Sequence, residues 1–261
     1  MTGALAEQPA SPLVGQVEIR ERSGTDCVTE NGTFCFDWAV DNFDRYTTPL
    51  WEHVLLVVPS VAFGFLIAFG LALLSHRRRW LIAPLTGATG ILYTIPSLAF
   101  FFLLLPVTGR GRDTAIIALT AYTLQIIYRN MVTGLANVPS EAKDAGRGMG
   151  MSENQLLRQV ELPLSIPEII AGLRIATVST VAIATLAVFA GGGGLGAAIY
   201  ADLDFKTNVL IAGGLCVLMA IVFDLLLLIL QAFLLPWRGA EAARGERPGG
   251  RFMDHFRRTA T

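Results

Sequence analysis

Long apolar runs alternate with short polar segments along most of this chain. Each helix that crosses a bilayer needs about 20 mostly apolar residues, and five runs meet that requirement. They cover residues 51–74, 80–107, 114–135, 169–190 and 208–235. The pattern predicts an all-α polytopic membrane protein with about five transmembrane helices.

Two of these runs carry internal breaks. The run 80–107 would be about 42 Å long as a helix at 1.5 Å per residue, against a hydrocarbon core of about 30 Å. We expect it to tilt, to begin at the interface or to bend, with Pro96 as the expected bend. The run 169–190 ends in four glycines, which we expect to turn the chain at the outer surface, either as a gate or as a plain connector. They are Gly191, Gly192, Gly193 and Gly194.

A polar island, residues 144–163, separates the third run from the fourth and reads DAGRGMGMSENQLLRQVELP. It predicts two short helices joined at a sharp bend. Ser140 follows a proline and can cap the first helix. Gly150 can adopt the left-handed conformation that ends it.

The second short helix has a stronger start signal. Ser152 with Gln155 three residues later fits a capping box, and Met151 and Leu156 occupy the positions of a hydrophobic staple. Pro163 is expected to stop this helix. A rigid helix, bend and helix on the water side of a membrane protein would give another protein a firm place to bind.

Composition and charge support a membrane protein and suggest its orientation. Of 261 residues, 53% are hydrophobic and 16% charged, and the mean hydropathy is +0.54, which argues against a soluble domain. Fourteen of the twenty Lys and Arg residues fall in three alternate segments, 76–79, 129–174 and 238–261. By the positive-inside rule these segments face the cytoplasm, which predicts an outer N-terminus and a cytoplasmic C-terminus.

Both ends of the chain lie outside the apolar runs, so we expect three units: an extracytoplasmic extension 1–48, a transmembrane domain 49–237 and a basic tail 238–261. In the extension, a one-sided apolar stripe predicts a short helix at the membrane surface, although an irregular tail throughout stays open. The stripe consists of Phe36, Val40, Phe43 and Tyr46. The basic tail either contacts anionic lipid head groups or is solvated.

Motifs for nucleotide and metal chemistry are not apparent. The sequence contains no Gly-x-x-x-x-Gly-Lys-Ser/Thr loop, so we expect no nucleotide site of that kind. Cys27, Cys35 and Cys216 form no metal-binding pattern. Cys27 and Cys35 either pair as a disulfide outside the cytoplasm or remain free.

The polar island carries a recognisable signature. The membrane subunits of binding-protein-dependent ABC importers share Glu-Ala-Ala, three residues, Gly, nine residues and Ile-x-Leu-Pro. Here Asp144, Ala145 and Gly146 stand at the Glu-Ala-Ala positions, with Asp and Gly as the two departures. Gly150 is the glycine, and 160–163 supplies Val, Leu162 and Pro163 at the final positions. The segments TIPSLAF, YRNMVTGL and AGGGGLG further resemble permeases of the glycine betaine, carnitine and choline importers, and the resemblance covers about residues 51–237.

The resemblance implies the permease core of a type I ABC importer with a cytoplasmic coupling-helix loop, in the plasma (inner) membrane. A separate cytoplasmic ABC ATPase dimer would use ATP and Mg, so this chain would be neither an enzyme nor the holder of a cofactor. A second permease, identical or paralogous, and an extracytoplasmic solute-binding protein would complete the assembly, with no nucleic acid partner. Transport would follow alternating access and carry a small osmoprotectant such as glycine betaine, choline, carnitine or proline betaine. The alternatives are a permease of the same architecture for methionine, another amino acid or an oxyanion, and, more distantly, an ATP-independent channel or a membrane enzyme.

Small and hydroxyl side chains on two of the runs are candidates for the translocation path. Such faces either line a wet pathway or pack closely against other helices. Tyr93 and Tyr122 could each help a quaternary ammonium to cross through cation–π contact, or could simply pack in the core. The candidates are Tyr93, Thr94, Ser97, Tyr122, Thr177 and Thr180.

Asp224 is an acid deep inside the last run. An intramembrane carboxylate is costly unless it is paired. We expect a structural ion pair with Arg129 or Arg174, and a role in coupling or solute passage stays open.

Overall fold

The computed structural model describes residues 27–28, 31 and 34–235, and within this part every regular element is a helix. Four helical runs are long and apolar enough to cross a membrane, and a bent pair can supply a fifth crossing. The four runs are Phe43–Arg77, Arg112–Ala136, Glu153–Ala190 and Lys206–Leu234, and the bent pair is Arg79–Thr94 with Ser97–Thr108. The all-helical fold with about five spans is confirmed.

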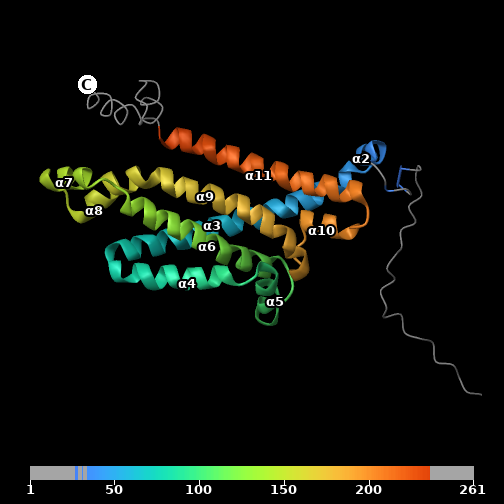
Figure 1. Ribbon diagram of the computed structural model, residues 1–261, viewed down its shortest axis with the longest axis horizontal. Coiled ribbons are helices and arrows are strands. Elements are labelled where there is room, and N and C mark those ends of the chain that lie inside the picture. Colours follow the sequence, from blue (N-terminus) through green and yellow to red (C-terminus); the bar gives the residue numbers. More distant parts are fainter. Residues whose placement is uncertain (1–26, 29–30, 32–33, 236–261) are drawn as a thin grey trace, which may run out of the picture.

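The bundle is built around one central helix. α6 packs against α3 and against α9, while α11 packs against α9 (Figure 1). The polar elbow, formed by α7 (Ser140–Gly148) and α8 (Glu153–Leu156), lies at one end of the long axis, and α2 (Phe36–Asp41) and α10 (Leu195–Ala201) lie at the other (Figure 1). The bounds are α3, Thr47–Arg77; α6, Arg112–Ala136; α9, Leu162–Ala184; and α11, Lys206–Leu234.

Glycines let α6 approach both neighbours closely. A Cβ atom added at Gly64 of α3 would lie 1.8 Å from Oγ1 of Thr123 on α6. A Cβ atom added at Gly172 of α9 would lie 2.4 Å from Cβ of Asn130, which is also on α6. Close backbone approach at small residues is a main source of helix association in membranes, where lipid offers no hydrophobic drive between helices. Glycine at these two positions therefore allows α3 and α9 to pack closely against α6, which places α6 at the centre of the bundle.

The second apolar run is broken at Pro96, as predicted. α4 (Ile82–Thr94) follows a short 3₁₀ turn η2 (Arg79–Leu81), and α5 (Ser97–Thr108) leaves it at 96°. Ile95 is extended, with ψ 127°, because a proline disfavours the α conformation in the residue before it. At 1.5 Å per residue α5 is only about 18 Å long, so it cannot cross the hydrocarbon core alone.

Two expectations about the elbow are wrong. α7 (Ser140–Gly148) begins with Ser140 inside the helix and Pro139 as its N-cap, so the Ser140 hydroxyl caps nothing and instead bonds Glu141. The second helix does not stop at Pro163: α8 (Glu153–Leu156) continues through a π-helical segment η3 (Leu157–Glu161) into α9. Proline is tolerated at the first positions of an α-helix, and the π segment changes the hydrogen-bond spacing just before it.

The opposite end contains the glycine run and the N-terminal elements. The 3₁₀ helix η4 (Thr185–Ala190) leads into the glycines and then α10 (Leu195–Ala201). Cys27 and Cys35 form a disulfide beside α2 (Phe36–Asp41) and η1 (Phe43–Tyr46). The expected short helix is present as α2, and the side chains of Phe36, Val40 and Phe43 are exposed. Its location at a membrane surface stays a prediction. Residues 1–26 and the basic tail 238–261 lie outside the described residues.

Tyr46 departs from the predicted exposed stripe. Its side chain is buried, and its hydroxyl donates a hydrogen bond of 2.7 Å to Oδ1 of Asn208 on α11. A buried tyrosine hydroxyl needs such a partner, because an unpaired one would lose its bonds to water. The contact ties the start of α3 to the start of α11.

Candidate functional site

The elbow turns at Gly150 through a complete Schellman motif. Gly150 has φ +81°, in the left-handed region that favours glycine. Its N–H donates to the carbonyl of Arg147 at 2.9 Å, and the N–H of Met151 donates to the carbonyl of Gly146 at 3.2 Å. These two bonds satisfy the last carbonyls of α7. The predicted left-handed Gly150 is confirmed.

The second helix of the elbow starts with the predicted capping box. The Ser152 hydroxyl accepts a bond from the Gln155 N–H at 3.4 Å, and Oε1 of Gln155 accepts one from the Ser152 N–H at 2.8 Å. Only Met149, Gly150, Met151 and Ser152 separate the two helices. Capping on both sides of so short a connection holds one geometry.

Gly146 explains one departure from the family signature. It is buried, and a Cβ atom added there would lie 2.6 Å from Cδ1 of Leu156 and 3.4 Å from Sδ of Met151. Leu156 is itself fully buried. An alanine at this position would therefore require the end of the Leu156 side chain to shift. The predicted staple residues Met151 and Leu156 both lie against this glycine.

The outer face of the elbow is open to solvent. Ala145 is exposed and Met149 is 70% exposed. Asp144, at the signature's Glu position, lies 3.7 Å from Arg147, which also contacts Glu153 at 3.3 Å. The Glu153 hydrogen bond and charge raise the pKa of Arg147 further above its usual value. These exposed pairs contribute little to stability, so the face presents a small apolar patch with a charged rim.

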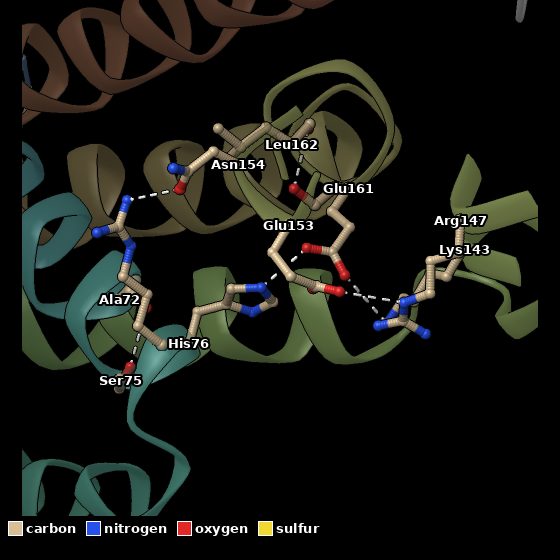
Figure 2. A network of polar contacts seen from close by, with 11 residues as sticks. Ala72, Ser75, His76, Lys143, Arg147, Glu153, Asn154, Glu161 and Leu162 are labelled. Atoms are coloured by element: carbon tan, nitrogen blue, oxygen red, sulfur yellow. Dashed lines mark hydrogen bonds and ion pairs between the residues drawn. The ribbon is translucent and has the colours of Figure 1, made fainter. Parts of the chain in front are cut away.

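The inner face of the elbow is clamped to the end of α3 by a buried carboxylate that sequence reasoning missed. Oε2 of Glu161 lies 2.8 Å from Nε2 of His76, and Oε1 lies 3.6 Å from Nζ of Lys143 (Figure 2). Glu161 is only 5% exposed. Beside it, the Arg77 guanidinium donates to Oδ1 of Asn154 at 3.0 Å. We call these three side chains, His76, Lys143 and Glu161, the elbow clamp.

The signals for the clamp were present but ambiguous. Glu161 is an acid between Val160 and Leu162, and His76 opens a basic run that the positive-inside rule already accounted for. The sequence around either residue does not predict the contact between them, because the two residues are far apart in the chain.

The glycine run at the other end is also held by α3. Gly191, Gly193 and Gly194 have φ values of +81°, +75° and +80°. The Gly194 N–H donates to Oε2 of Glu52 at 3.0 Å. A Cβ atom added at Gly193 would lie 2.5 Å from that same oxygen. The predicted turn is confirmed, and its role as an outer gate stays a prediction.

His53 completes this attachment from a fully buried position. Its Nδ1 accepts a hydrogen bond of 3.2 Å from the Leu195 N–H, and its Nε2 lies 3.0 Å from the carbonyl of Val181. Since Nδ1 accepts, Nε2 must carry the proton and donate, which assigns the neutral tautomer. Sequence reasoning gave no role to Glu52 or His53, because they lie inside an apolar run with no motif around them.

Comparison with known proteins identifies the family. Residues 57–239 match the family described as the binding-protein-dependent transport system inner membrane component. The chain belongs to this family. It is therefore a multi-pass permease of the inner membrane.

Relatives of this permease have been named for their solutes. The chain is 37% identical over 206 residues to the osmoprotectant import permease protein OsmW of Salmonella typhimurium, across 76% of this chain and 96% of the relative. It is 36% identical over 188 residues to the choline transport system permease protein OpuBB of Bacillus subtilis, across 71% and 87%. It is 37% identical over 212 residues to the carnitine transport permease protein OpuCB of Listeria monocytogenes, across 80% and 95%.

Solved structures share the permease fold. A chain of the inward-facing MetNI methionine ABC transporter superposes with a TM-score of 0.63 at 21% identity, covering 72% of this chain and 94% of that one. A chain of an amino acid ABC transporter with histidines gives 0.59 at 19%, covering 76% and 98%. The predicted type I ABC importer fold is confirmed.

The candidate path residues of the permease lie in two settings. Tyr93 and Thr94 are exposed and Ser97 is partly exposed, and the Tyr93 ring meets that of buried Tyr122 with centroids 5.8 Å apart. The Tyr122 hydroxyl donates to the carbonyl of Ile95. Thr177 and Thr180 are buried, and each donates its hydroxyl to the carbonyl four residues earlier in α9. Their role in solute passage stays a prediction.

Asp224 of the permease pairs with Arg174, one of the two predicted partners. Nε and one terminal nitrogen of Arg174 donate to the two carboxylate oxygens at 2.7 and 2.8 Å. The two side chains are 29% and 30% exposed. A two-bond arginine–carboxylate contact is the strong form of an ion pair, and it satisfies the charge of an acid within an apolar helix.

Proposed function

We propose that this chain is the transmembrane permease subunit of an ATP-driven importer of small osmoprotectants, such as glycine betaine, choline, carnitine or proline betaine. The observation that carries the proposal is the elbow at Gly150, with its two capped helices, buried Gly146 and exposed outer face. The solute class rests on the names of the relatives. A separate ATPase dimer would bind ATP and Mg and dock on the outer face of α7.

The elbow passes motion into the bundle through α3. The last turn of this helix carries His76 of the elbow clamp, and its first turns carry Glu52 and His53, which accept hydrogen bonds from Gly194 at the end of the glycine run and from the next residue, Leu195. At 1.5 Å per residue, its 31 residues span about 46 Å. Displacing the elbow when the ATPases close would therefore move the glycine run at the far end. This supports alternating access, with the glycine run as the outer gate.

The orientation follows from charge. The elbow and the end of α11 face the cytoplasm, and α2 and the disulfide face the outside, because the basic residues gather on the elbow side. A second permease copy or paralogue completes the central path. An extracytoplasmic solute-binding protein delivers the solute and performs most of the selection.

Co-purification with transport measurement tests the proposal. The chain is expressed with its native neighbours, isolated from membranes through an affinity tag and analysed for a stoichiometric ATPase. Reconstituted vesicles should take up labelled glycine betaine or choline only when ATP is present on the side of the membrane that carries the ATPase. Isolation without an ATPase, or uptake without ATP, would favour a channel. Competition by methionine but not by betaines would favour the amino-acid alternative.

A further inference from the structure

A cavity of about 320 Å³ lies next to the elbow clamp. It opens between the last turn of α3, the turn η2 with the start of α4, the end of α6 and the first turns of α7. Figure 2 shows two of its residues, His76 and Lys143, on either side of Glu161, with Ala72 and Ser75 along the same turn of α3. The cavity thus sits where four helix ends meet.

The polar side of this cavity is basic. His76, Arg79 and Lys143 line it, and none of its nine lining residues, all in the described part of the chain, is acidic. The nearby carboxylate of Glu161 contacts His76 and Lys143. One negative charge there balances Lys143, which leaves the charge of Arg79 in excess. The cavity therefore favours an anion.

The other side chains that line the cavity are apolar except for Ser75, whose hydroxyl donates to the carbonyl of Ala72. The largest of them are Ile82, Val132 and Leu135. A free hydrated anion would leave these apolar side chains exposed to water, whereas an amphiphile would cover them with its first methylene groups. The cavity also lies at helix ends, and in the orientation proposed above these ends face the cytoplasmic head groups. Basic pockets between transmembrane helices on this side suit anionic head groups.

We propose that this cavity binds the phosphate head group of an anionic phospholipid, held by Arg79 and Lys143, with the start of an acyl chain against Ile82, Val132 and Leu135. The bound lipid contacts α4, α6 and α7 at once. It therefore joins the elbow to the membrane beside the clamp. The site does not depend on the solute or on the direction of transport.

Lipid retention in the full-length protein tests the proposal. The protein, purified from membranes with the subunits that accompany it, is placed in mixed phosphatidylglycerol and phosphatidylcholine, and bound lipid is counted by native mass spectrometry. The unchanged chain should retain phosphatidylglycerol selectively. Arg79→Gln should lower that retention by about fivefold, the change that loss of roughly 1 kcal/mol per basic side chain produces. Arg78→Gln, an exposed neighbour outside the cavity, is the matched control and should not.

Two further measurements separate the alternatives. Ala136→Phe fills the cavity without changing charge and should also lower retention; if it fails to fold, the Arg79 and Arg78 pair decides. Inorganic phosphate at the lipid's concentration should not displace the lipid. The lipid site would be overturned by any of three results. These are equal losses of retention in both arginine variants, unchanged retention in a folded Ala136→Phe variant, and displacement of the lipid by phosphate.

Discussion

The two ends of α3 attach different machinery by different chemistry. At its last turn, His76 contacts the buried carboxylate of Glu161 at 2.8 Å, and the Arg77 guanidinium donates a hydrogen bond to Asn154. At its first turns, Glu52 and His53 hold the glycine run through backbone N–H groups. A disulfide and the Tyr46–Asn208 hydrogen bond lie at this second end. Contacts between ionisable or polar side chains hold the end that carries the signature loop, whereas side chains that accept from backbone N–H groups hold the end that carries the glycines.

The contrast teaches where each end can yield. Ion pairs keep part of their strength when geometry shifts, because Coulomb attraction falls slowly with distance. Hydrogen bonds to backbone N–H groups are lost within a fraction of an ångström. An elbow held by charged groups can therefore move while it stays attached to α3. The glycine run, in contrast, either keeps its hydrogen bonds to α3 or loses them. Substitutions at each end of α3 should therefore have different effects on uptake.

The largest effect is expected at Gly150. Gly150→Trp should leave membrane insertion intact but reduce ATP-dependent uptake to background, because the left-handed conformation costs a non-glycine residue about 1–2 kcal/mol and the bulky ring obstructs docking. Western blotting of membranes and uptake of labelled solute measure the two quantities. Gly150→Asn is the control, since asparagine tolerates this conformation. Normal uptake in the tryptophan variant would count heavily against the elbow as the coupling site.

Glu161→Gln should have the next largest effect. Removing one partner of a buried ion pair costs about 3–5 kcal/mol, so the elbow should loosen from α3 and uptake should fall strongly. Protease sensitivity of the elbow in isolated membranes measures the loosening. Glu153→Gln removes an exposed carboxylate from the same elbow and should cost less than about 1 kcal/mol. Similar losses in both variants would show that burial of the clamp has no special role.

His53→Phe should affect the opposite end. It removes the acceptor of the Leu195 N–H and the donor to the Val181 carbonyl, at a cost of about 2 kcal/mol. Uptake should fall while the ATPase still co-purifies, since the elbow is untouched. Glu52→Gln keeps an acceptor for the Gly194 N–H and should be milder. Loss of the ATPase in the His53 variant would contradict the separation of the two ends.

The smallest effect on uptake is expected from the disulfide. Replacing Cys27 and Cys35 by serine should cost about 2–3 kcal/mol of local stability and leave uptake close to that of the unchanged chain. The same cysteines test orientation: after reduction, a membrane-impermeant thiol reagent should label them in intact cells, and the double serine variant is the control. Labelling only after lysis would reverse the proposed orientation.

The sequence by itself determined the local features of this protein. The apolar runs gave the spans, Pro96 gave the 96° break, and Gly150, Ser152 and Gln155 gave the elbow geometry. Each depends on interactions within a few residues, such as caps, backbone preferences and periodicity. Pro163 and Ser140 were predicted wrongly because the same residues are compatible with more than one local arrangement. A proline suits the first turn of a helix as well as the residue after its end.

Only the tertiary structure decided which distant side chains meet. Glu161 finds His76 85 positions away, and Asp224 finds Arg174 rather than Arg129. Glu52 accepts from Gly194 and His53 accepts from Leu195, each 142 positions away. An isolated acid or histidine specifies that it needs a partner, because burial without one is costly. Which partner it finds depends on how the helices pack, and α6 sets that packing by bringing α3 and α9 together through contacts at Gly64 and Gly172.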